Sequence, residues 1–196
     1  FEFMPRVYMD VYADMHPNAR APFETGYDIN ILVELGATAP RDCDDSESGE
    51  QPLTAQLETT LAELFEEGLV TDAVVAQTQA QRDTFWACRE AAAEVLLSHQ
   101  PTLVTDVAVA VDQVGTFLER ADPAIRSVDP TARGISVAHL GDGNIHYTIW
   151  LSDAAHRDPI MQIVEDIVVD LGGSFSAEHG IGLSKLSSMR RRKAPA

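Results

Sequence analysis

The sequence predicts an α+β fold in which a ferredoxin-like, split βαβ antiparallel sheet carries its helices on one face. From residue 103 onward, the apolar pattern gives the order strand, helix, strand, strand, helix, strand. A Gly-Asp-Gly-Asn segment at residues 141–144 joins the two middle strands and is typical of a tight hairpin turn. No segment repeats at a period of roughly 20–50 residues, which argues against a solenoid.

The residues before position 103 give weaker signals. Prolines and a glycine interrupt residues 1–26, so we expect an irregular lead-in there. Residues 27–36 are typical of a buried strand, and the acidic residues 41–50 are typical of a surface loop. Apolar residues at helical spacing over 53–65 predict a helix that ends at Gly68.

The remaining elements follow from periodicity and turn signals. A β-branched run over 69–77 predicts a strand, and this earlier strand-helix-strand unit is expected to extend the same sheet. The elements expected next are a long helix over 78–98, a strand over 103–111, a helix over 114–125, strands over 134–140 and 144–151, a helix over 160–171 and a short strand over 174–178. A basic, solvated helix is expected at the end of the chain.

Composition argues against several classes of protein. The 196 residues include 31 acidic and 14 basic side chains, a formal net charge of −17. A body this acidic repels phosphate backbones, so nucleic acid is not an expected partner. No apolar run is long enough for a transmembrane helix. Only Cys43 and Cys88 are present, too few for a disulfide framework, so a cytoplasmic location is the simplest expectation.

The segment 137–146, Val-Ala-His-Leu-Gly-Asp-Gly-Asn-Ile-His, contains the residue types that point to chemistry. If residues 142–143 form a two-residue turn, His139 pairs directly with His146 on one face of the hairpin. Two imidazoles held in this way can share one metal ion at roughly 2.0–2.1 Å each. Side chains alternate along a strand, so Thr148 shares the face of His146.

Glu178 is the natural third ligand, because it ends the last predicted strand and is followed by His179 and two nearby glycines. Adjacent strand residues point to opposite sides, so we do not expect Glu178 and His179 both to be ligands. The glycines allow the chain to turn and present His179 to a cleft. Two histidines and one carboxylate with open positions describe a catalytic divalent-metal site, with Zn²⁺ expected first and Mn²⁺ or Fe²⁺ as alternatives. Spacing alone also allows a simple polar pair of histidines without an ion.

The same segments resemble the C-terminal domain of FAD-linked 2-hydroxyacid dehydrogenases. The family includes D-lactate dehydrogenase, the glycolate oxidase flavin subunit and D-2-hydroxyglutarate dehydrogenase. Its motifs are similar to His-Leu-Gly-Asp-Gly-Asn-Ile-His (139–146) and Ala-Glu-His-Gly-Ile-Gly-Leu-Ser-Lys (177–185). Residues 85–90, Phe-Trp-Ala-Cys-Arg-Glu, are similar to its Trp-x-x-Arg-Glu helix. The resemblance is strongest over 134–185 and only topological before residue 80.

The resemblance implies that residues 1–196 are a single C-terminal cap or substrate domain of a longer flavoenzyme. In this division, 1–26 is the lead-in, 27–185 the core and 186–196 a basic tail with a truncated end. The N-terminal domain of the parent chain would hold most of the FAD, so we expect this fragment alone to be inactive. The full protein would be an FAD-linked oxidoreductase that converts a D-2-hydroxy acid to the 2-oxo acid.

The resemblance also implies roles for single side chains. His139, His146 and Glu178 would hold the metal at the hydroxyl and carboxylate oxygens of the substrate. His179 would accept the hydroxyl proton as general base, since its unperturbed pKa of about 6.5 suits proton transfer near neutrality. Arg89 would bind the carboxylate bidentately while the hydride passes to flavin.

Three positions depart from the 2-hydroxyglutarate branch of the family. Ala93, Val104 and Thr148 stand where that branch has Thr, Lys and Asn. A second substrate carboxylate without a cationic partner in a dry pocket would cost on the order of several kcal/mol. We therefore expect a smaller or more apolar 2-hydroxy acid, with Thr148 among the residues that contact it.

Two other functions stay open at this point. A metal-dependent hydrolase would use an ion-activated water and no flavin, and an FAD-binding region upstream of this chain would argue against it. A non-catalytic binding module would use the ion structurally, and a closed site with four ligands would favour that function. The sequence leaves open which 2-hydroxy acid is bound, which electron acceptor is used and whether the chain forms a homodimer.

Overall fold

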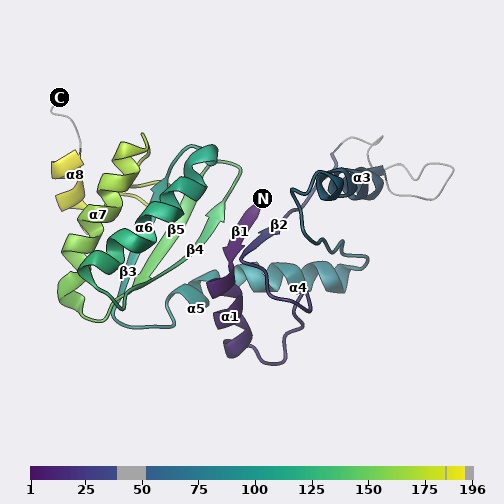
Figure 1. Ribbon diagram of the computed structural model, residues 1–196, viewed down its shortest axis with the longest axis horizontal. Helices are drawn as coiled ribbons and strands as arrows, with labels where there is room; N and C mark the ends of the chain where they lie inside the picture. Colours follow the sequence, from purple (N-terminus) through teal and green to yellow (C-terminus); the bar gives the residue numbers. More distant parts are fainter. Residues whose placement is uncertain (39–51, 184, 193–196) are drawn as a thin grey trace.

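The computed structural model describes residues 1–38, 52–183 and 185–192, and its centre is a five-stranded antiparallel sheet (Figure 1). The strands, in the spatial order β2-β1-β4-β5-β3, are β1 (Glu2–Pro5), β2 (Ile29–Leu32), β3 (Thr102–Ala108), β4 (Arg133–His139) and β5 (Asn144–Trp150). The helices are α1 (Arg6–Met15), α3 (Pro52–Glu66), α4 (Gln79–Glu90), α5 (Ala92–Leu96), α6 (Val114–Val128), α7 (Arg157–Asp170) and α8 (Leu186–Arg192). The predicted α+β class is confirmed.

The predicted split βαβ unit is formed by β3, α6, β4, β5 and α7. β5 lies between β3 and β4 and pairs antiparallel with both. The place of a fourth strand beside β3 is taken by a single bridge between Ala108 and Ser174. The prediction of a strand over 174–178 is therefore wrong except at Ser174, which forms this bridge. Ser174 Oγ instead exchanges local hydrogen bonds with the backbone of Ser176, which competes with a ladder.

The irregular lead-in predicted over 1–26 is wrong, because this segment contains β1 and α1. Pro5 takes the N-cap of α1 with an extended backbone, so the proline marks the border between two regular elements. β1 pairs with β4 on one side and β2 on the other, and thus extends the sheet. β2 lies within the predicted 27–36 segment, but it is a partly exposed edge strand rather than a buried one.

The region between β2 and β3 differs from prediction in two places. Residues 69–77 form no strand, and the helix predicted over 78–98 is divided at Ala91 into α4 and α5. Tyr8 contributes to this division, since its hydroxyl donates to the carbonyl of Cys88 at 2.6 Å, a group that a continuous helix would use itself. α3 and its end at Gly68, where φ is +72°, are as predicted. The acidic segment 41–50 lies outside the described residues.

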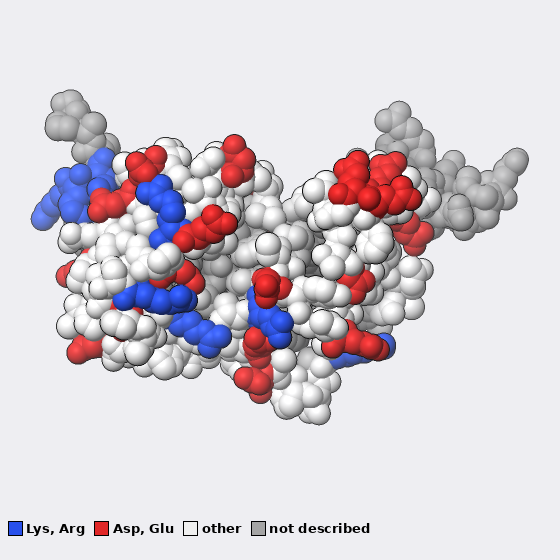
Figure 2. Space-filling view, in the orientation of Figure 1, with Lys and Arg blue, Asp and Glu red and all other residues white. Residues whose placement is uncertain are grey.

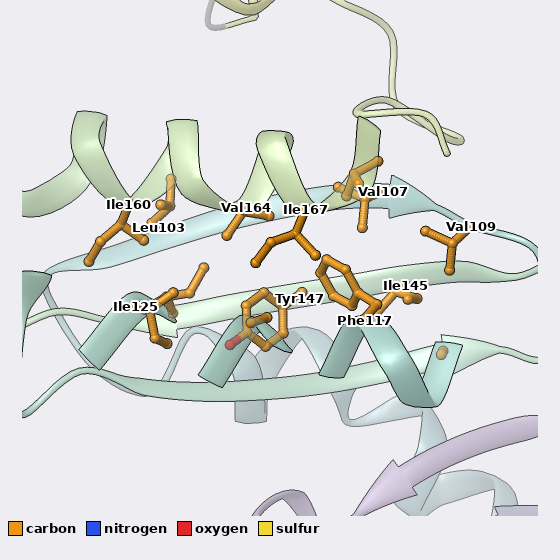
Figure 3. Packing of buried hydrophobic residues seen from close by; sticks show 14 of the residues in the cluster. Leu103, Val107, Val109, Phe117, Ile125, Ile145, Tyr147, Ile160, Val164 and Ile167 are labelled. Carbon is orange, nitrogen blue, oxygen red and sulfur yellow. The ribbon is translucent and has the colours of Figure 1, made fainter. Parts of the chain in front are cut away.

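One face of the sheet is covered by α6 and α7, which pack against each other (Figure 3). α7 lies over β3 and α6 over β4, and side chains of β5 fill the space between them. The side chains between them are apolar and almost completely buried, as expected from the strand and helix periods. They include Leu103, Val107, Phe117, Ile125, Ile145, Tyr147, Ile149, Ile160 and Val164. This layer is the main core.

The opposite face is partly covered by α1 and α5, so helices lie on both faces rather than on one. The second layer follows from the added β1–α1 unit, because α1 packs over β4 next to β1. Its buried residues are Met4, Tyr8, Cys88, Ala92, Val95, Leu96, Ile135 and Val137. Alternation along β4 and β5 puts His139 and His146 on this second face, next to the part that the helices leave open.

Two of the basic side chains of α8 are paired rather than fully solvated. Arg191 and Arg192 of α8 contact the buried carboxylate of Glu165 on α7 at 2.9 and 3.3 Å. In the space-filling view, Lys and Arg side chains gather over α8, and acidic side chains gather over α3 at the other end (Figure 2). Within the described residues, no helix combines the length and apolar character that a bilayer crossing requires.

Candidate metal centre

His139 and His146 lie on neighbouring strands but are not directly opposite each other. His139 pairs with Asn144, and His146 pairs with Val137, so the predicted direct pairing is wrong. The loop has four residues, 140–143, instead of two. This register differs from the predicted one by two positions, which leaves every side chain on its expected face. The two imidazoles meet diagonally, with their Nε2 atoms 3.4 Å apart.

Glu178 reaches both imidazoles from the segment that follows the Ala108–Ser174 bridge. Its two carboxylate oxygens lie 3.9 Å from His139 Nε2 and 3.9 Å from His146 Nε2. The three ligand atoms all lie within 4.8 Å of one another. Ligands at roughly 2.0–2.1 Å from a tetrahedral ion are about 3.3 Å apart, so the imidazole pair already has the required spacing. Glu178 is half exposed and can close the remaining gap.

Glu2 orients His139, and nothing in the sequence analysis had singled it out. His139 Nδ1 lies 2.9 Å from Glu2 Oε1. Burial raises the pKa of Glu2, but hydrogen bonds from His139 and Arg89 outweigh this and bring the pKa below its usual value. The ionised carboxylate only accepts hydrogen bonds, so His139 Nδ1 holds the proton and Nε2 presents a lone pair to the centre. A carboxylate behind a ligating histidine is the usual support of a metal site.

Arg89 lies at the site, in the last turn of α4, and one edge of its guanidinium is already bound to Glu2. Its Nε donates to Glu2 Oε2 at 2.6 Å, and its side chain is only 11% exposed. A terminal guanidinium nitrogen lies 3.4 Å from His139 Nε2. The terminal edge of the guanidinium therefore faces the centre, whereas the Nε edge is occupied by Glu2.

The surroundings of His146 favour its neutral form. Burial lowers the pKa of His146, while the nearby carboxylates of Asp106 and Glu178 act in the opposite direction and do not compensate. Metal ions bind the neutral imidazole, so this shift suits a ligand. Asp106 is the direct cross-strand partner of His146 and is the second site residue that the sequence analysis missed.

His179 and Thr148 occupy different surroundings. The His179 ring lies 5.8 Å from the His146 ring, centre to centre, and the side chain is 62% exposed. Because the chain is not extended here, Glu178 and His179 both reach the site even though they are adjacent. Thr148 lies on the same sheet face but is fully buried, and its hydroxyl has no hydrogen-bond partner among the described residues. The structure thus brings together His139, His146, Glu178, His179 and Arg89 and leaves Thr148 beneath the surface.

Comparisons with known proteins find a matching family and several relatives. A family model described as FAD linked oxidases, C-terminal domain, matches residues 1–196. A D-2-hydroxyglutarate dehydrogenase from Stutzerimonas stutzeri is 32% identical over 183 residues, which are 90% of this chain and 37% of that protein. The mitochondrial D-2-hydroxyglutarate dehydrogenase of Arabidopsis thaliana is 29% identical over 199 residues, 100% of this chain and 33% of that protein. A D-2-hydroxyglutarate–pyruvate transhydrogenase of Saccharomyces cerevisiae is 27% identical over 94% of this chain and 37% of its own length. The chain therefore spans about a third of the length of these relatives.

Proposed function

Because the chain belongs to the family of C-terminal domains of FAD-linked oxidases, we propose that its full-length protein is an FAD-dependent dehydrogenase or oxidase of D-2-hydroxy acids. In this proposal, residues 1–196 form one domain that binds the substrate and a divalent metal ion. The FAD is held mostly by an N-terminal domain of the same protein. The family match favours this function over a hydrolase that uses no flavin.

The observation that supports the metal site is the convergence of His139, His146 and Glu178 around one point. The donor set of two imidazole nitrogens and a carboxylate suits Zn²⁺, Mn²⁺ or Fe²⁺ and leaves positions open for a substrate. Glu2 fixes the protonated nitrogen of His139 on the far side of its ring. A divalent ion bound there would polarise the hydroxyl and carboxylate oxygens of the substrate, and FAD would accept the hydride.

The residues of this chain would bind the substrate and move its proton. His179, whose backbone N–H donates to Asp106 Oδ2 at 2.7 Å, would accept the hydroxyl proton through its imidazole. The terminal nitrogens of Arg89 would donate to the substrate carboxylate, while Glu2 holds the Nε edge in place. For Thr148 to contact the substrate, the side chains that cover it would have to move, because it is fully buried.

We propose a substrate that is smaller or more apolar than 2-hydroxyglutarate. The relatives above are named for D-2-hydroxyglutarate, but Val104 places an apolar side chain, 44% exposed, on the site face of β3 opposite Thr148. The same proposal includes a cytoplasmic location, for which the low cysteine content is the support.

The test uses the full-length protein, because the flavin is needed for turnover. We expect about one equivalent of a divalent metal in the wild-type protein and much less in His139→Ala. We also expect flavin reduction by D-lactate to be faster than by D-2-hydroxyglutarate. Equal, negligible metal in both proteins would overturn the metal site, and much faster turnover of D-2-hydroxyglutarate would overturn the substrate preference.

A further inference from the structure

Lys185 ends the second motif of the sequence, residues 177–185, and the proposed function gives this lysine no role. Its side chain is only 13% exposed, and lysine side chains are seldom buried to this extent without a partner. The ammonium Nζ donates a hydrogen bond to Ser176 Oγ at 2.9 Å and lies 3.7 Å from Asp106 Oδ2. Lys185 therefore connects the end of the motif to the residue before its beginning and to the edge strand β3.

Few other contacts hold the segment that Lys185 spans. After its single bridge to β3, the described residues of this segment form no helix or strand. The carbonyl of Asp106 accepts from Ala177 N–H at 3.2 Å, and Asp106 Oδ2 accepts from His179 N–H at 2.7 Å. The side chains of Glu178 and His179 are half exposed or more, so packing does not hold them in place. Their positions depend on the hydrogen bonds of the backbone that carries them.

The hydrogen bonds of Ser176 run in one direction, because an ammonium group only donates. Ser176 Oγ accepts from Lys185 Nζ, so the hydroxyl proton is directed to a different acceptor. That acceptor is the carbonyl of His179, 2.5 Å from Oγ. Donation from a charged group polarises the hydroxyl and strengthens its second hydrogen bond. Lys185 thus acts on the backbone of His179 through one hydroxyl group.

Lys185 is itself held between two elements of the fold. α8 begins at the next residue, and Arg191 and Arg192 of this helix contact the buried carboxylate of Glu165 on α7. On the other side, Asp106 is buried on β3, and the positive charge of Lys185 offsets the desolvation of this carboxylate. The ammonium therefore has a fixed place from which it can hold the weakly supported segment.

We propose that Lys185 is a positioning residue of the site. Its ammonium, through the hydroxyl of Ser176, fixes the turn that presents Glu178 and His179 to the two imidazoles of the sheet. This inference rests on the proposed function for the chemistry of Glu178 and His179, but not for the path of the segment. In this role Lys185 acts through Ser176 and is not itself a ligand.

The test uses the full-length protein and begins with Ser176→Ala, which removes the hydroxyl and keeps Lys185 beside Asp106. Ser176→Thr keeps a hydroxyl at the same position and is the conservative rescue. Ser187→Ala is the matched control, because Ser187 is an exposed serine of α8. Lys185→Met removes the donor and completes a double-mutant cycle with Ser176→Ala.

Amide hydrogen exchange at residues 177–180 should become about 10-fold faster in Ser176→Ala and stay at the wild-type rate in Ser176→Thr and Ser187→Ala. Lys185→Met should also exchange faster. Adding Ser176→Ala to Lys185→Met should cause no further increase, because both changes break the same chain of hydrogen bonds.

The second measurement is flavin reduction at saturating substrate, with D-lactate or D-2-hydroxyglutarate, whichever is faster for the wild type. The rate should fall about 10- to 100-fold in Ser176→Ala, because a displaced His179 accepts the hydroxyl proton poorly. Ser176→Thr should restore the rate, and Ser187→Ala should not change it. A loss of overall stability alone would not produce this recovery.

The outcomes separate this inference from the proposed function. Unchanged exchange at 177–180 in Ser176→Ala, or effects that multiply in the double variant, would overturn the role of Lys185 whatever reaction the protein catalyses. Faster exchange without slower flavin reduction would overturn its positioning role in the site. A wild type whose flavin no D-2-hydroxy acid reduces would overturn the proposed function, and the exchange data would still decide how the segment is held. If Lys185→Met does not fold, Ser176→Ala and Ser176→Thr decide the inference by the same two measurements.

Discussion

The two faces of the sheet use the same strands for opposite purposes. On the face covered by α6 and α7, Ile145, Tyr147 and Ile149 of β5 are at most 1% exposed and lie in the main core. On the other face, the alternate positions of β5 include His146, which lies beside buried or half-buried charges. Apolar burial stabilises the fold, whereas desolvated charges oppose it unless they are paired. The comparison teaches that stability and ligand binding can be changed separately, one face at a time.

The largest effect is expected from Phe117→Ala on the core face. Phe117 is fully buried on α6, and its ring meets Tyr147 edge-on at 5.5 Å. The lost contacts and the cavity should lower the free energy of unfolding by about 3–5 kcal/mol. Urea unfolding measures this loss, and ion titration of the folded protein should show unchanged affinity.

A matched control for Phe117→Ala is Val169→Ala on α7, where the side chain is 46% exposed. It should change the free energy of unfolding by no more than about 0.5 kcal/mol. If Phe117→Ala weakened ion binding as strongly as it weakened the fold, the two faces would not be separable.

Asp129 makes the free energy of unfolding depend on pH, and this residue belongs to neither face of the comparison. Burial raises the pKa of Asp129, but hydrogen bonds from the backbone and hydroxyl of Ser152, and then from His156 and Thr131, outweigh it and hold the pKa well below its usual range. Between the folded and unfolded pKa values the unfolded chain binds more protons, so stability decreases as the pH is lowered through that window. Asp129 should contribute its full stabilisation above about pH 5. This stabilisation should be lost progressively as the pH falls below about 3.9, the pKa of an Asp in the unfolded chain.

Asp129→Asn should therefore cost about 1–3 kcal/mol of unfolding free energy at pH 7, and the difference from wild type should shrink below about pH 4. Chemical unfolding of the ion-free protein between pH 3 and pH 7 measures both values. A difference that stays constant over this range would show that Asp129 is not the source of the acid sensitivity.

Glu2→Gln is the corresponding change on the site face. The amide keeps the size of the side chain but presents a weaker, uncharged partner to His139 and Arg89. We expect roughly 10- to 100-fold weaker ion binding, by calorimetric titration. The unfolding free energy should also fall, because the nearly buried Arg89 loses its charged partner. Glu119→Gln on the exposed side of α6 is the control. Equal affinities in wild type and Glu2→Gln would remove Glu2 from the metal centre.

The smallest effect is expected from Thr78→Ala at the start of α4. Thr78 and Gln81 form a reciprocal capping box, and its loss should cost about 1 kcal/mol. Arg89 is near the other end of the same helix, so ion affinity should stay the same. Thermal unfolding and ion titration check the two parts, and reduced affinity would mean that fraying of α4 extends to the site.

The sequence predicted the sheet from residue 103 onward because its signals are local. The periods of two and about 3.6 define β3, α6, β4, β5 and α7, and each element buries the face that its own pattern marks. The register of the hairpin could not be predicted in this way. Val109 N–H donates to the carbonyl of Gly143, and a side chain on Gly143 would overlap the Val109 carbonyl oxygen. A residue outside the hairpin thus helps to set the conformation of its loop.

The sequence predicted the motif residues of the candidate site, but it did not predict the residues that support them. Glu2 is 137 positions from His139, so no local period connects them. One signal was present, since Glu2 alternates with Phe1 and Phe3 as in a strand. Asp106 also gave a signal, because an ionisable residue in the middle of an apolar strand is rarely buried without a partner.

The place of Glu2 in the fold has a consequence for the timing of ion binding. β1 pairs with β4 only through Glu2 and Phe3, and its other neighbour, β2, is the partly exposed edge of the sheet. Short edge elements of this kind open at a lower free energy than the whole domain. Each opening would separate His139 from the Glu2 carboxylate while α6 and α7 stay packed. Thermal opening at this edge of the sheet would therefore control how fast a bound ion exchanges.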